Sequence, residues 1–243
     1  MCYNYSLKAN KQQIEQRYKA LFESVEDFTP VYHTSGFVYG KMPVILSNDP
    51  DHIKLLNWGL IPGWSKDKTK AMAARANTLN ARCETLYEKP SFRGSIKSKR
   101  CLIPATGFFE WMDVNKVKYP FYISLKDQEI FSFGGLWEVT HFTNEQGEKE
   151  THETFSIITT DANPLMERIH NLKKRMPFIL PKETESRWLN DQLTKEDVEA
   201  MLLPFPESGM QAHTISKLIT SRTESPNVPR VIEPFEYADL LGQ

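Results

Sequence analysis

Apolar side chains near the amino terminus recur at the spacing of a helix. They fall at Ile14, Tyr18, Leu21, Phe22 and Val25. Asn10 precedes them and is a residue type that caps helices well. The spacing predicts a helix that starts after Asn10, reaches Val25 and buries one face.

Most of the remaining pattern predicts strands. β-branched, aromatic and aliphatic residues dominate residues 31–46, 53–61, 99–111, 121–125, 130–137, 155–160 and 176–180. The short gap at residues 126–129 predicts a hairpin between the strands on either side. Residues 143–153 are polar and charged, so we expect a flexible loop there. A short helix should start after Asn163, with Pro164 in its first turn. Residues 183–203 predict one or two surface helices, the second capped by Thr194.

Trp64 is expected on a loop. It ends the segment WGLIPGW at residues 58–64, in which Pro62 and Gly63 indicate a turn after a strand. A tryptophan on a loop is either half-buried packing or a platform on which nucleobases stack.

Length and composition favour one domain. The chain has 243 residues, 40% of them hydrophobic, and the economical interpretation is a single domain over residues 1–243, with a Pro- and Ser-rich tail from about 204 that wraps the surface. No apolar run reaches the ~18 residues that span a bilayer. We therefore expect a protein that stays where it is made and binds no membrane.

Cysteine and histidine usage argues against metal and disulfide frameworks. The three cysteines have no CxxC spacing, and the six histidines show no pair with metal-ligand spacing. We expect no metal and no cofactor.

The net charge of −1 argues against a non-specific, histone-like DNA binder. Basic residues nevertheless cluster at residues 66–70, 93–100 and 173–175. Such clusters fit a positive groove that contacts phosphates, and they fit solvated surface charge about equally well.

Cys2 is the first candidate for chemistry. Initiator Met is readily removed before a side chain as small as Cys, which would leave an α-amine and a thiol on adjacent carbons. This pair can condense with an aldehyde to an imine and then close a thiazolidine ring. Reference pKa values of about 7.7–8.0 for the amine and about 8.5 for the thiol allow this near neutral pH. The alternative is an ordinary buried thiol.

Glu110 is the second candidate, because it lies between Phe109 and Trp111 in an apolar stretch. It is either an outward-facing residue of an alternating strand or an acid/base whose pKa is raised by burial.

Several short blocks now combine into a recognisable set. They are Met1-Cys2, WGLIPGW at 58–64, NARCET at 80–85, CLIPATGFFEW at 101–111, Ile169-His170, and RMPFIL at 175–180. In order and content this set resembles the SOS-response-associated peptidase (SRAP) family. The resemblance implies an α+β fold built on a curved, barrel-like, mostly antiparallel sheet flanked by helices. It also implies a DNA-damage protein that shields abasic sites in single-stranded DNA through a thiazolidine at Cys2, with self-reversal, lyase-like chemistry and autopeptidase activity.

The same resemblance implies roles for individual residues. Catalysis would use Cys2, Asn80, Glu110 and His170, with Glu110 desolvated by Phe109 and Trp111. Binding of DNA, including single-strand/duplex junctions, would use Arg82, Trp64, Lys173, Lys174 and Arg175. The protein would act as a monomer in the cytoplasm, associated with the nucleoid when on DNA, or in the nucleus of a eukaryote.

The chain departs from the family pattern at three places. Tyr3-Asn4 stands where Gly-Arg is usual, and residues 32–36 replace an Asn-x-Ala-Pro block, so no family role transfers to His33. The loop at residues 171–174 is longer than usual and adds two lysines.

Two other classes of function remain open. An N-terminal-nucleophile amidohydrolase or peptidase would also use Cys2, with the freed amine as its base. A non-covalent single-stranded DNA-binding module would use Trp64 and the basic loops.

Overall fold

Two β-sheets form the framework of the protein in a computed structural model, which describes residues 2–23 and 28–240. The strands of the smaller sheet are, in spatial order, β14 (Met210–Thr214), β9 (Val117–Leu125), β8 (Gly107–Val114), β1 (Asn4–Leu7) and β3 (Val31–Ser35). The larger sheet has the order β12 (Arg175–Pro177), β11 (Lys149–Asp161), β10 (Phe131–Thr143), β7 (Arg100–Ala105), β4 (Lys41–Leu46), β5 (Asp49–Trp58) and β2 (Leu21–Phe22). Two short strands extend it, β6 (Asn80–Arg82) on β11 and β13 (Ile179–Leu180) on β10.

The larger sheet closes on itself. β11 also pairs in parallel with β5, with Thr154 opposite Asn57 and Phe155 opposite Trp58. The ring β11–β10–β7–β4–β5 is therefore a closed barrel. Its other ladders are antiparallel, so the barrel-like, mostly antiparallel sheet that the resemblance implied is confirmed.

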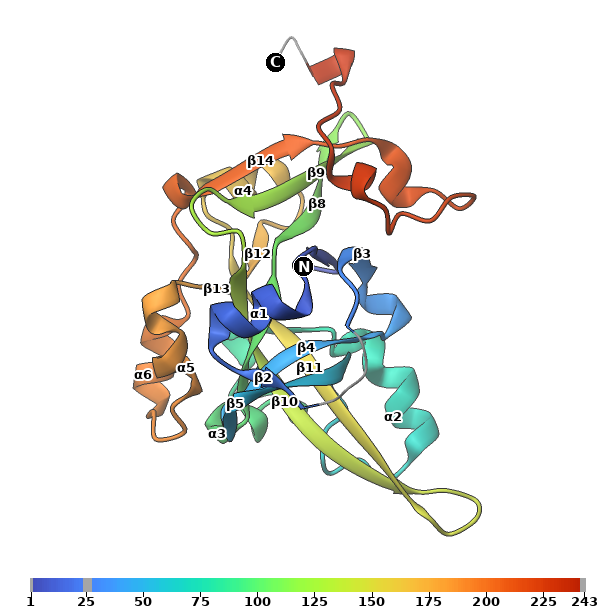
Figure 1. Cartoon of the computed structure of the whole chain (residues 1–243), viewed down its shortest axis with the longest axis vertical. Coiled ribbons are helices and arrows are strands. Elements are labelled where there is room, and N and C mark those ends of the chain that lie inside the picture. Colours follow the sequence, from blue (N-terminus) through green and yellow to red (C-terminus); the bar gives the residue numbers. More distant parts are fainter. Residues whose placement is uncertain (1, 24–27, 241–243) are drawn as a thin grey trace.

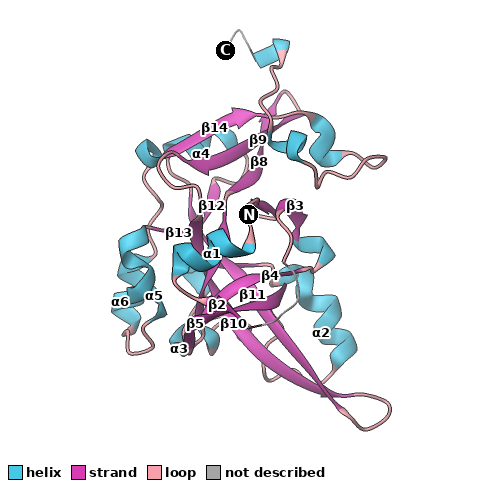
Figure 2. Ribbon diagram, in the orientation of Figure 1, coloured by secondary structure: helices cyan, strands magenta, loops and turns pink. Residues whose placement is uncertain are grey.

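Helices lie around the outside of the strands (Figure 2). They are α1 (Lys11–Tyr18), α2 (Lys68–Ala74), α3 (Ser95–Ser98), α4 (Pro164–Ile169), α5 (Glu185–Leu189) and α6 (Lys195–Met201). Figure 1 shows β14, β9 and β8 above the barrel, and the long hairpin of β10 and β11 extending below it. No helix within the described residues is long and apolar enough to cross a membrane.

The first helix is shorter than its apolar spacing predicts. Asn10 caps α1 through a capping box with Gln13, as expected, but Lys19 adopts a left-handed conformation with φ 55° and ends the helix. Leu21 and Phe22 then form β2 beside β5. Val25 lies outside the described residues.

Three further expectations about strands are wrong. The strands on either side of residues 126–129 do not form a hairpin, because β9 pairs with β8 and β14 whereas β10 pairs with β7, β11 and β13. Residues 99–111 form two strands in different sheets, β7 and β8, instead of one. Residues 143–153 are mostly strand: the ladder between β10 and β11 continues to Thr143 opposite Lys149. A tight turn stabilised by Asn144, whose side chain accepts from the backbone N–H groups of Gln146 and Glu148, joins them.

The segment beyond residue 204 contributes a strand to the smaller sheet. β14 pairs with β9 along its whole length. The segment after β14 supplies Ile215, Ile219 and Val231 to a small apolar cluster with Phe109 and Tyr122. This segment therefore covers the outer face of β8 and β9.

A large apolar core fills the barrel and the space between it and β1. Gly135 of β10 permits the close packing there, since a Cβ at this position would lie 2.4 Å from Ile103 Cδ1 and 2.6 Å from the Ser156 carbonyl oxygen. Thr106 links the two sheets: its backbone N–H donates to the Ser6 carbonyl oxygen of β1 at 2.8 Å. The strand that carries the amino terminus is thus held against the barrel.

Candidate active site

The amino-terminal strand brings Cys2 and Tyr3 next to β8. β1 and β8 are antiparallel, with Tyr5 opposite Phe108 and Ser6 opposite Gly107. Extending this register by two residues places Tyr3 opposite Glu110. Two segments far apart in the sequence therefore meet at one place.

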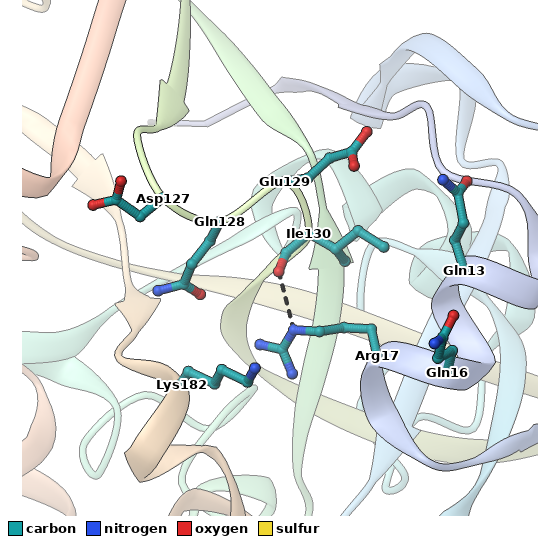
Figure 3. A pocket seen from close by; sticks show the side chains of 8 residues that line it. All are labelled: Gln13, Gln16, Arg17, Asp127, Gln128, Glu129, Ile130 and Lys182. Carbon is teal, nitrogen blue, oxygen red and sulfur yellow. Dashed lines mark hydrogen bonds between the residues drawn. The ribbon is translucent and has the colours of Figure 1, made fainter.

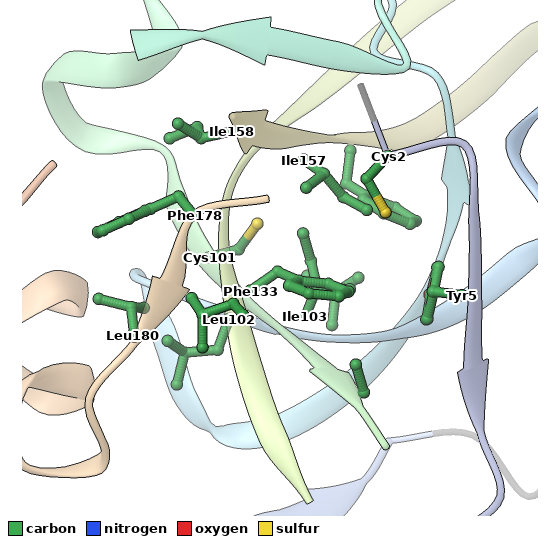
Figure 4. Packing of buried hydrophobic residues seen from close by; sticks show 14 of the residues in the cluster. Cys2, Tyr5, Cys101, Leu102, Ile103, Phe133, Ile157, Ile158, Phe178 and Leu180 are labelled. Carbon is green, nitrogen blue, oxygen red and sulfur yellow. The ribbon is translucent and has the colours of Figure 1, made fainter. Parts of the chain in front are cut away.

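The Cys2 side chain lies in the interior. It is fully buried in the cluster that contains Tyr5 and Ile157, and Figure 4 shows its sulfur among these side chains. The thiol donates a long hydrogen bond to the Asn4 carbonyl oxygen, with Sγ and O 3.8 Å apart. Burial, and secondarily the charge of Glu110, raise the pKa of the Cys2 thiol far above its ordinary value. The sulfur is therefore protonated in this conformation.

Glu110 lies in β8 opposite Phe121 of β9 and is 4% exposed. It is therefore not the outward-facing strand residue of the alternative interpretation. Burial raises the pKa of the Glu110 carboxyl from 4.5 to about 7. Both protonation states are then populated at neutral pH, which suits a group that transfers protons.

Phe109 and Trp111 were both expected to bury Glu110. Phe109 does not do so, whereas Trp111 packs on the Phe109 cluster and also lines the cleft with Glu110. Neighbouring residues of a strand point to opposite faces. Phe109 packs on Tyr122, with ring centroids 5.2 Å apart, in the C-terminal cluster. Phe108 belongs to the main core, so Phe108 and Glu110 share the face of β8 toward the amino terminus.

His170 faces Glu110 from the end of α4. Its Nε2 lies 3.8 Å from Glu110 Oε2. The opposite ring nitrogen, Nδ1, lies 2.8 Å from the Arg175 carbonyl oxygen. A carbonyl only accepts, so Nδ1 carries the proton. Burial lowers the pKa of His170 to about 4, which leaves Nε2 as a bare acceptor toward Glu110.

The loop after His170 is anchored to β8. The Asn171 amide donates to the Asp113 carbonyl oxygen at 2.8 Å and accepts from the Asp113 N–H at 3.1 Å. The Lys174 N–H closes the loop on the His170 carbonyl oxygen at 2.8 Å, and Lys174 has a φ of 48°. These contacts fix His170 relative to the strand that carries Glu110.

An open cleft of about 350 Å³ lies over this pair. Its lining consists of Tyr3, Glu110, Trp111, Asp113, Lys118, His170, Leu172, Lys173 and Thr220. The Cys2 side chain lies beneath the cleft, one residue from Tyr3, and does not line it. Sequence patterns gave no signal for Tyr3, Lys118 or Thr220, because their place depends on strand pairing and on the C-terminal segment.

Asn80 and Arg82 come from β6. Asn80 pairs with Ile157 of β11 and Arg82 with Thr159, and paired residues point to the same face. Asn80 is 7% exposed, and neither atom of its amide has a hydrogen-bond partner among the described residues. A buried amide of this kind is suited to bind a polar ligand. Arg82 is exposed at the end of the strand.

Arg175 has a different environment from the open basic surface expected for it. It is 8% exposed. Its guanidinium binds the Glu84 carboxylate, Asp161 Oδ1 at 2.9 Å and the Thr159 carbonyl oxygen at 2.7 Å. These contacts join β12 to β11 and to the segment after β6. Arg175 therefore stabilises the packing of these segments.

The other basic residues divide between surface and interior. Lys173 and Lys174 are exposed beside the cleft. Arg100, by contrast, is fully buried and donates to the backbone oxygens of Trp188 and Ile96 at 2.9 and 2.8 Å. The cluster at residues 93–100 is therefore not a continuous positive surface.

Trp64 lies on a loop, as expected, and is 64% exposed. Its Nε1 donates to the Pro90 carbonyl oxygen at 3.1 Å, and its ring lines a pocket of about 430 Å³ with Lys66 and Lys70. None of the residues of this pocket lines the cleft at Glu110. The structure therefore does not bring Trp64 into the catalytic group.

His33 has a positioning role. Its Nε2 lies 2.9 Å from Asn4 Oδ1, and its ring packs edge-on against Phe109. Burial lowers the pKa of His33 to about 4. The Asn4 side chain, at the place of the usual arginine, is thus held by a neutral histidine.

A second polar pocket, of about 380 Å³, lies beside α1 (Figure 3). It is lined by Gln13, Gln16, Arg17, Asp127, Gln128, Glu129, Ile130 and Lys182. Arg17 donates through Nε to the Ile130 carbonyl oxygen at 3.1 Å and binds the Glu185 carboxylate with its other nitrogens. This pocket holds none of the expected site residues, and its arginine joins α1 to α5.

Residues 1–222 match the family described as SOS response associated peptidase (SRAP). The chain belongs to the SRAP family. Abasic site processing protein YoqW of Bacillus subtilis is 38% identical over 240 residues, which cover 96% of this chain and 99% of that protein. Abasic site processing protein YoaM of the same bacterium is 39% identical over 182 residues, covering 74% and 75%. A crystal structure of a protein from Bacteroides thetaiotaomicron has a TM-score of 0.89 and 39% identity, and covers 97% of this chain and 100% of that one.

In the structure, several of the sequence blocks that resemble the SRAP family contact one another. The block at residues 80–85 forms β6 on β11 and supplies Glu84 to Arg175, which belongs to another block. The blocks at 101–111 and 169–170 supply Glu110 and His170. Cys2 and Tyr3 complete the group through the pairing of β1 with β8.

Proposed function

We propose that this SRAP protein captures abasic sites in single-stranded DNA by forming a thiazolidine between Cys2 and the ring-opened sugar. The observation that carries the proposal is the Glu110–His170 pair in an open cleft that is also lined by Tyr3, the residue after Cys2. The SRAP relatives named abasic site processing proteins support the choice of lesion. Removal of Met1, which lies outside the described residues, exposes the amine of Cys2.

Ring opening of the abasic sugar is the first chemical step. The closed sugar must lose the proton of its hydroxyl at C1 and regain one on the ring oxygen to become an aldehyde. His170 Nε2 is an acceptor, and Glu110, with a pKa of about 7, is a donor when protonated. Their 3.8 Å separation leaves room for a sugar oxygen between them.

Capture follows in two balanced steps. The neutral Cys2 amine adds to the aldehyde. Glu110 protonates the departing hydroxyl, which leaves as water, and the resulting iminium returns its N–H proton to Glu110 to give the neutral imine. The Cys2 side chain then turns from its buried position toward the cleft. Its sulfur adds to the imine carbon, and the thiol proton passes to the nitrogen. Because ring closure is intramolecular, a thiol that is not ionised is still effective. Reversal uses the same groups in the opposite direction.

Two side activities follow from the same groups. An imine that does not close to the thiazolidine loses the proton next to the former aldehyde carbon, and elimination then breaks the strand, as in a lyase. Where residues precede Cys2, the same site would hydrolyse the peptide bond before it, with consumption of one water.

DNA binding is assigned to the rim of the cleft. Arg82, Lys173 and Lys174 would contact phosphates on either side of the lesion, and the Asn80 amide would orient the sugar or the Cys2 amine. Trp64 would stack a base farther along the strand, at a junction with duplex. The protein would act as a monomer on DNA, in the cytoplasm with the nucleoid or in a nucleus.

A denaturing gel of the protein with abasic single-stranded DNA tests the proposal. We expect a heat-stable adduct for the wild type and none for Cys2→Ala. Wild-type protein that gives no adduct but hydrolyses glutamine analogues would instead indicate an N-terminal-nucleophile amidohydrolase. Binding without either reaction would leave a non-covalent DNA-binding module.

A further inference from the structure

An exposed aromatic side chain stands directly beside the cleft. Phe37 is 54% exposed, and its ring contacts that of Tyr3, with centroids 5.0 Å apart and planes at 37°. Tyr3 in turn lines the cleft with Glu110 and His170. The neighbouring Val38 is 69% exposed. Large apolar groups left in solvent next to a reactive site indicate a contact surface.

The turn that carries Phe37 is tightly held. Residues Gly36–Val38 form a 3-10 turn that ends at Tyr39, with φ 52°. The Gly36 N–H donates to the Tyr3 carbonyl oxygen at 2.8 Å. A Cβ on Gly36 would lie 3.0 Å from Leu79 Cδ2, so the turn sits directly on the core. The Phe37 ring is therefore presented on a rigid support, and little entropy is lost when a flat ligand stacks on it.

We infer that Tyr3 and Phe37 form a stacking platform for the nucleobase next to the abasic site. The inference rests on the proposed function and specifies how DNA lies at the cleft. An abasic nucleotide has no base of its own, so the adjacent base is the nearest flat apolar group available. Stacking it on Phe37 would hold the unpaired strand in place while the sugar enters the cleft.

Charge around the platform fits the same ligand. Burial raises the pKa of the Tyr3 phenol, the Glu110 charge adds to the rise, and the Arg82 guanidinium opposes it. Tyr3 is thus close to both the carboxyl in the cleft and the exposed Arg82 guanidinium. A phosphate bound by Arg82 would be next to a base on Phe37 and a sugar at Glu110. The three side chains would thus bind the phosphate, the base and the sugar of adjoining nucleotides.

The test measures DNA affinity and asks whether the effect of replacing Phe37 depends on one base beside the abasic site. The probes are single-stranded oligonucleotides with a tetrahydrofuran abasic analogue, which has no aldehyde and forms no adduct. In further probes a second copy of the same analogue replaces the adenine on the 5′ or the 3′ side of the first, which removes that one base. Wild-type affinity should fall about five- to tenfold when the base on one side is removed. Phe37→Ala should bind the probe that contains the adenine about five- to tenfold more weakly than the wild type does. Removing the adenine should not weaken the binding of Phe37→Ala any further.

Two variants serve as controls. Phe37→Trp keeps a stacking surface and should retain the wild-type dependence on the base. Phe235→Ala removes another exposed aromatic, 46% exposed and packed on Tyr237, that lies outside the cleft lining. It should leave both affinities unchanged. Wild-type affinity that ignores both flanking bases, or an equal base dependence in Phe37→Ala, would overturn the platform.

The outcome is separable from that of the proposed function. Adduct formation with true abasic DNA is measured separately for the wild type and for Phe235→Ala, which should reach the same yield. An adduct in the wild type, together with an affinity that does not depend on Phe37 and the flanking base, would refute the platform and support the thiazolidine. An affinity that depends on both, without an adduct in the wild type, would confirm the platform and refute the thiazolidine.

Discussion

Glu110 Oε2 and His170 Nε2 lie 3.8 Å apart, which is too far for a direct hydrogen bond and suits a shared oxygen ligand. Burial moves the two pKa values in opposite senses from those of the free side chains, up to about 7 for Glu110 and down to about 4 for His170. At neutral pH the pair therefore has a carboxyl able to donate and an imidazole able to accept. In water the carboxyl would be ionised at neutral pH and could not donate.

Replacing Glu110 by Gln should slow adduct formation without removing the end point. A general acid or base typically contributes about 10²–10⁴-fold to a rate. The amide preserves size and hydrogen bonding but does not transfer a proton near neutral pH. Time courses of the adduct with abasic single-stranded DNA provide the measurement. A Glu110→Gln protein that reacts at the wild-type rate would exclude Glu110 from the mechanism.

The pH dependence of the wild-type rate should be bell-shaped. The rate rises as the Cys2 amine loses its proton, and falls above about 7 as Glu110 ionises and can no longer protonate the leaving hydroxyl. In Glu110→Gln the fall on the alkaline side should disappear, and the rise should remain. A descending limb that persists in this variant would assign that ionisation to another group.

The same carboxyl should make stability depend on pH. Because the pKa of Glu110 is higher in the folded than in the unfolded protein, its stabilising effect is complete below about 4.5 and is lost as pH rises through about 7. Relative to the wild type, Glu110→Gln should therefore gain free energy of unfolding over this interval, by up to roughly 3 kcal/mol. Urea unfolding of both proteins at pH 5 and pH 8 compares them. A difference that does not change with pH would mean that the carboxyl is not buried in solution.

The proximity of Glu110 and His170 agrees with the short sequence blocks that contain them. Asn80, Glu110 and His170 were each named from the sequence, and the structure brings Glu110 and His170 together. The approach of β8 to the end of α4 could not be derived from periodicity, because it depends on contacts between segments that are distant in sequence. The place of Phe109 shows the limit: adjacency to Glu110 in sequence suggested contact, but the alternation of a strand separates the two side chains.

Local patterns failed where long-range pairing decided the structure. The gap between β9 and β10 has hairpin length, yet β9 belongs to the small sheet and β10 to the barrel. Arg175 read as a surface cation from its basic neighbours. Its guanidinium instead binds Glu84 and Asp161, which are distant in sequence. Charge patterning alone does not reveal such partners.

Arg175 and Lys173 should behave differently when replaced by Ala. Arg175→Ala removes hydrogen bonds to Glu84, Asp161 and Thr159, and should lower the free energy of unfolding by about 1–3 kcal/mol. Lys173 is exposed beside the cleft, so Lys173→Ala should leave stability unchanged. It should instead reduce the slope of log affinity against log salt for single-stranded DNA by about 0.7, the value for one phosphate contact. Lys173→Ala protein with an unchanged salt slope would remove that contact.

Replacing Cys2 by Ala should distinguish the role of the Cys2 sulfur from that of its amine. Cys2→Ala keeps an α-amine after removal of Met1, so it should still form an imine that borohydride traps, but no heat-stable adduct without the reductant. Its non-covalent affinity for DNA should stay close to that of the wild type, because the buried thiol does not line the cleft. In the wild type, intact-mass analysis after reaction should find Met1 only in the unreacted fraction, since a blocked amine cannot condense with the aldehyde. A heat-stable adduct that still carries Met1, or one formed by Cys2→Ala without borohydride, would refute the thiazolidine and require a different nucleophile in the cleft.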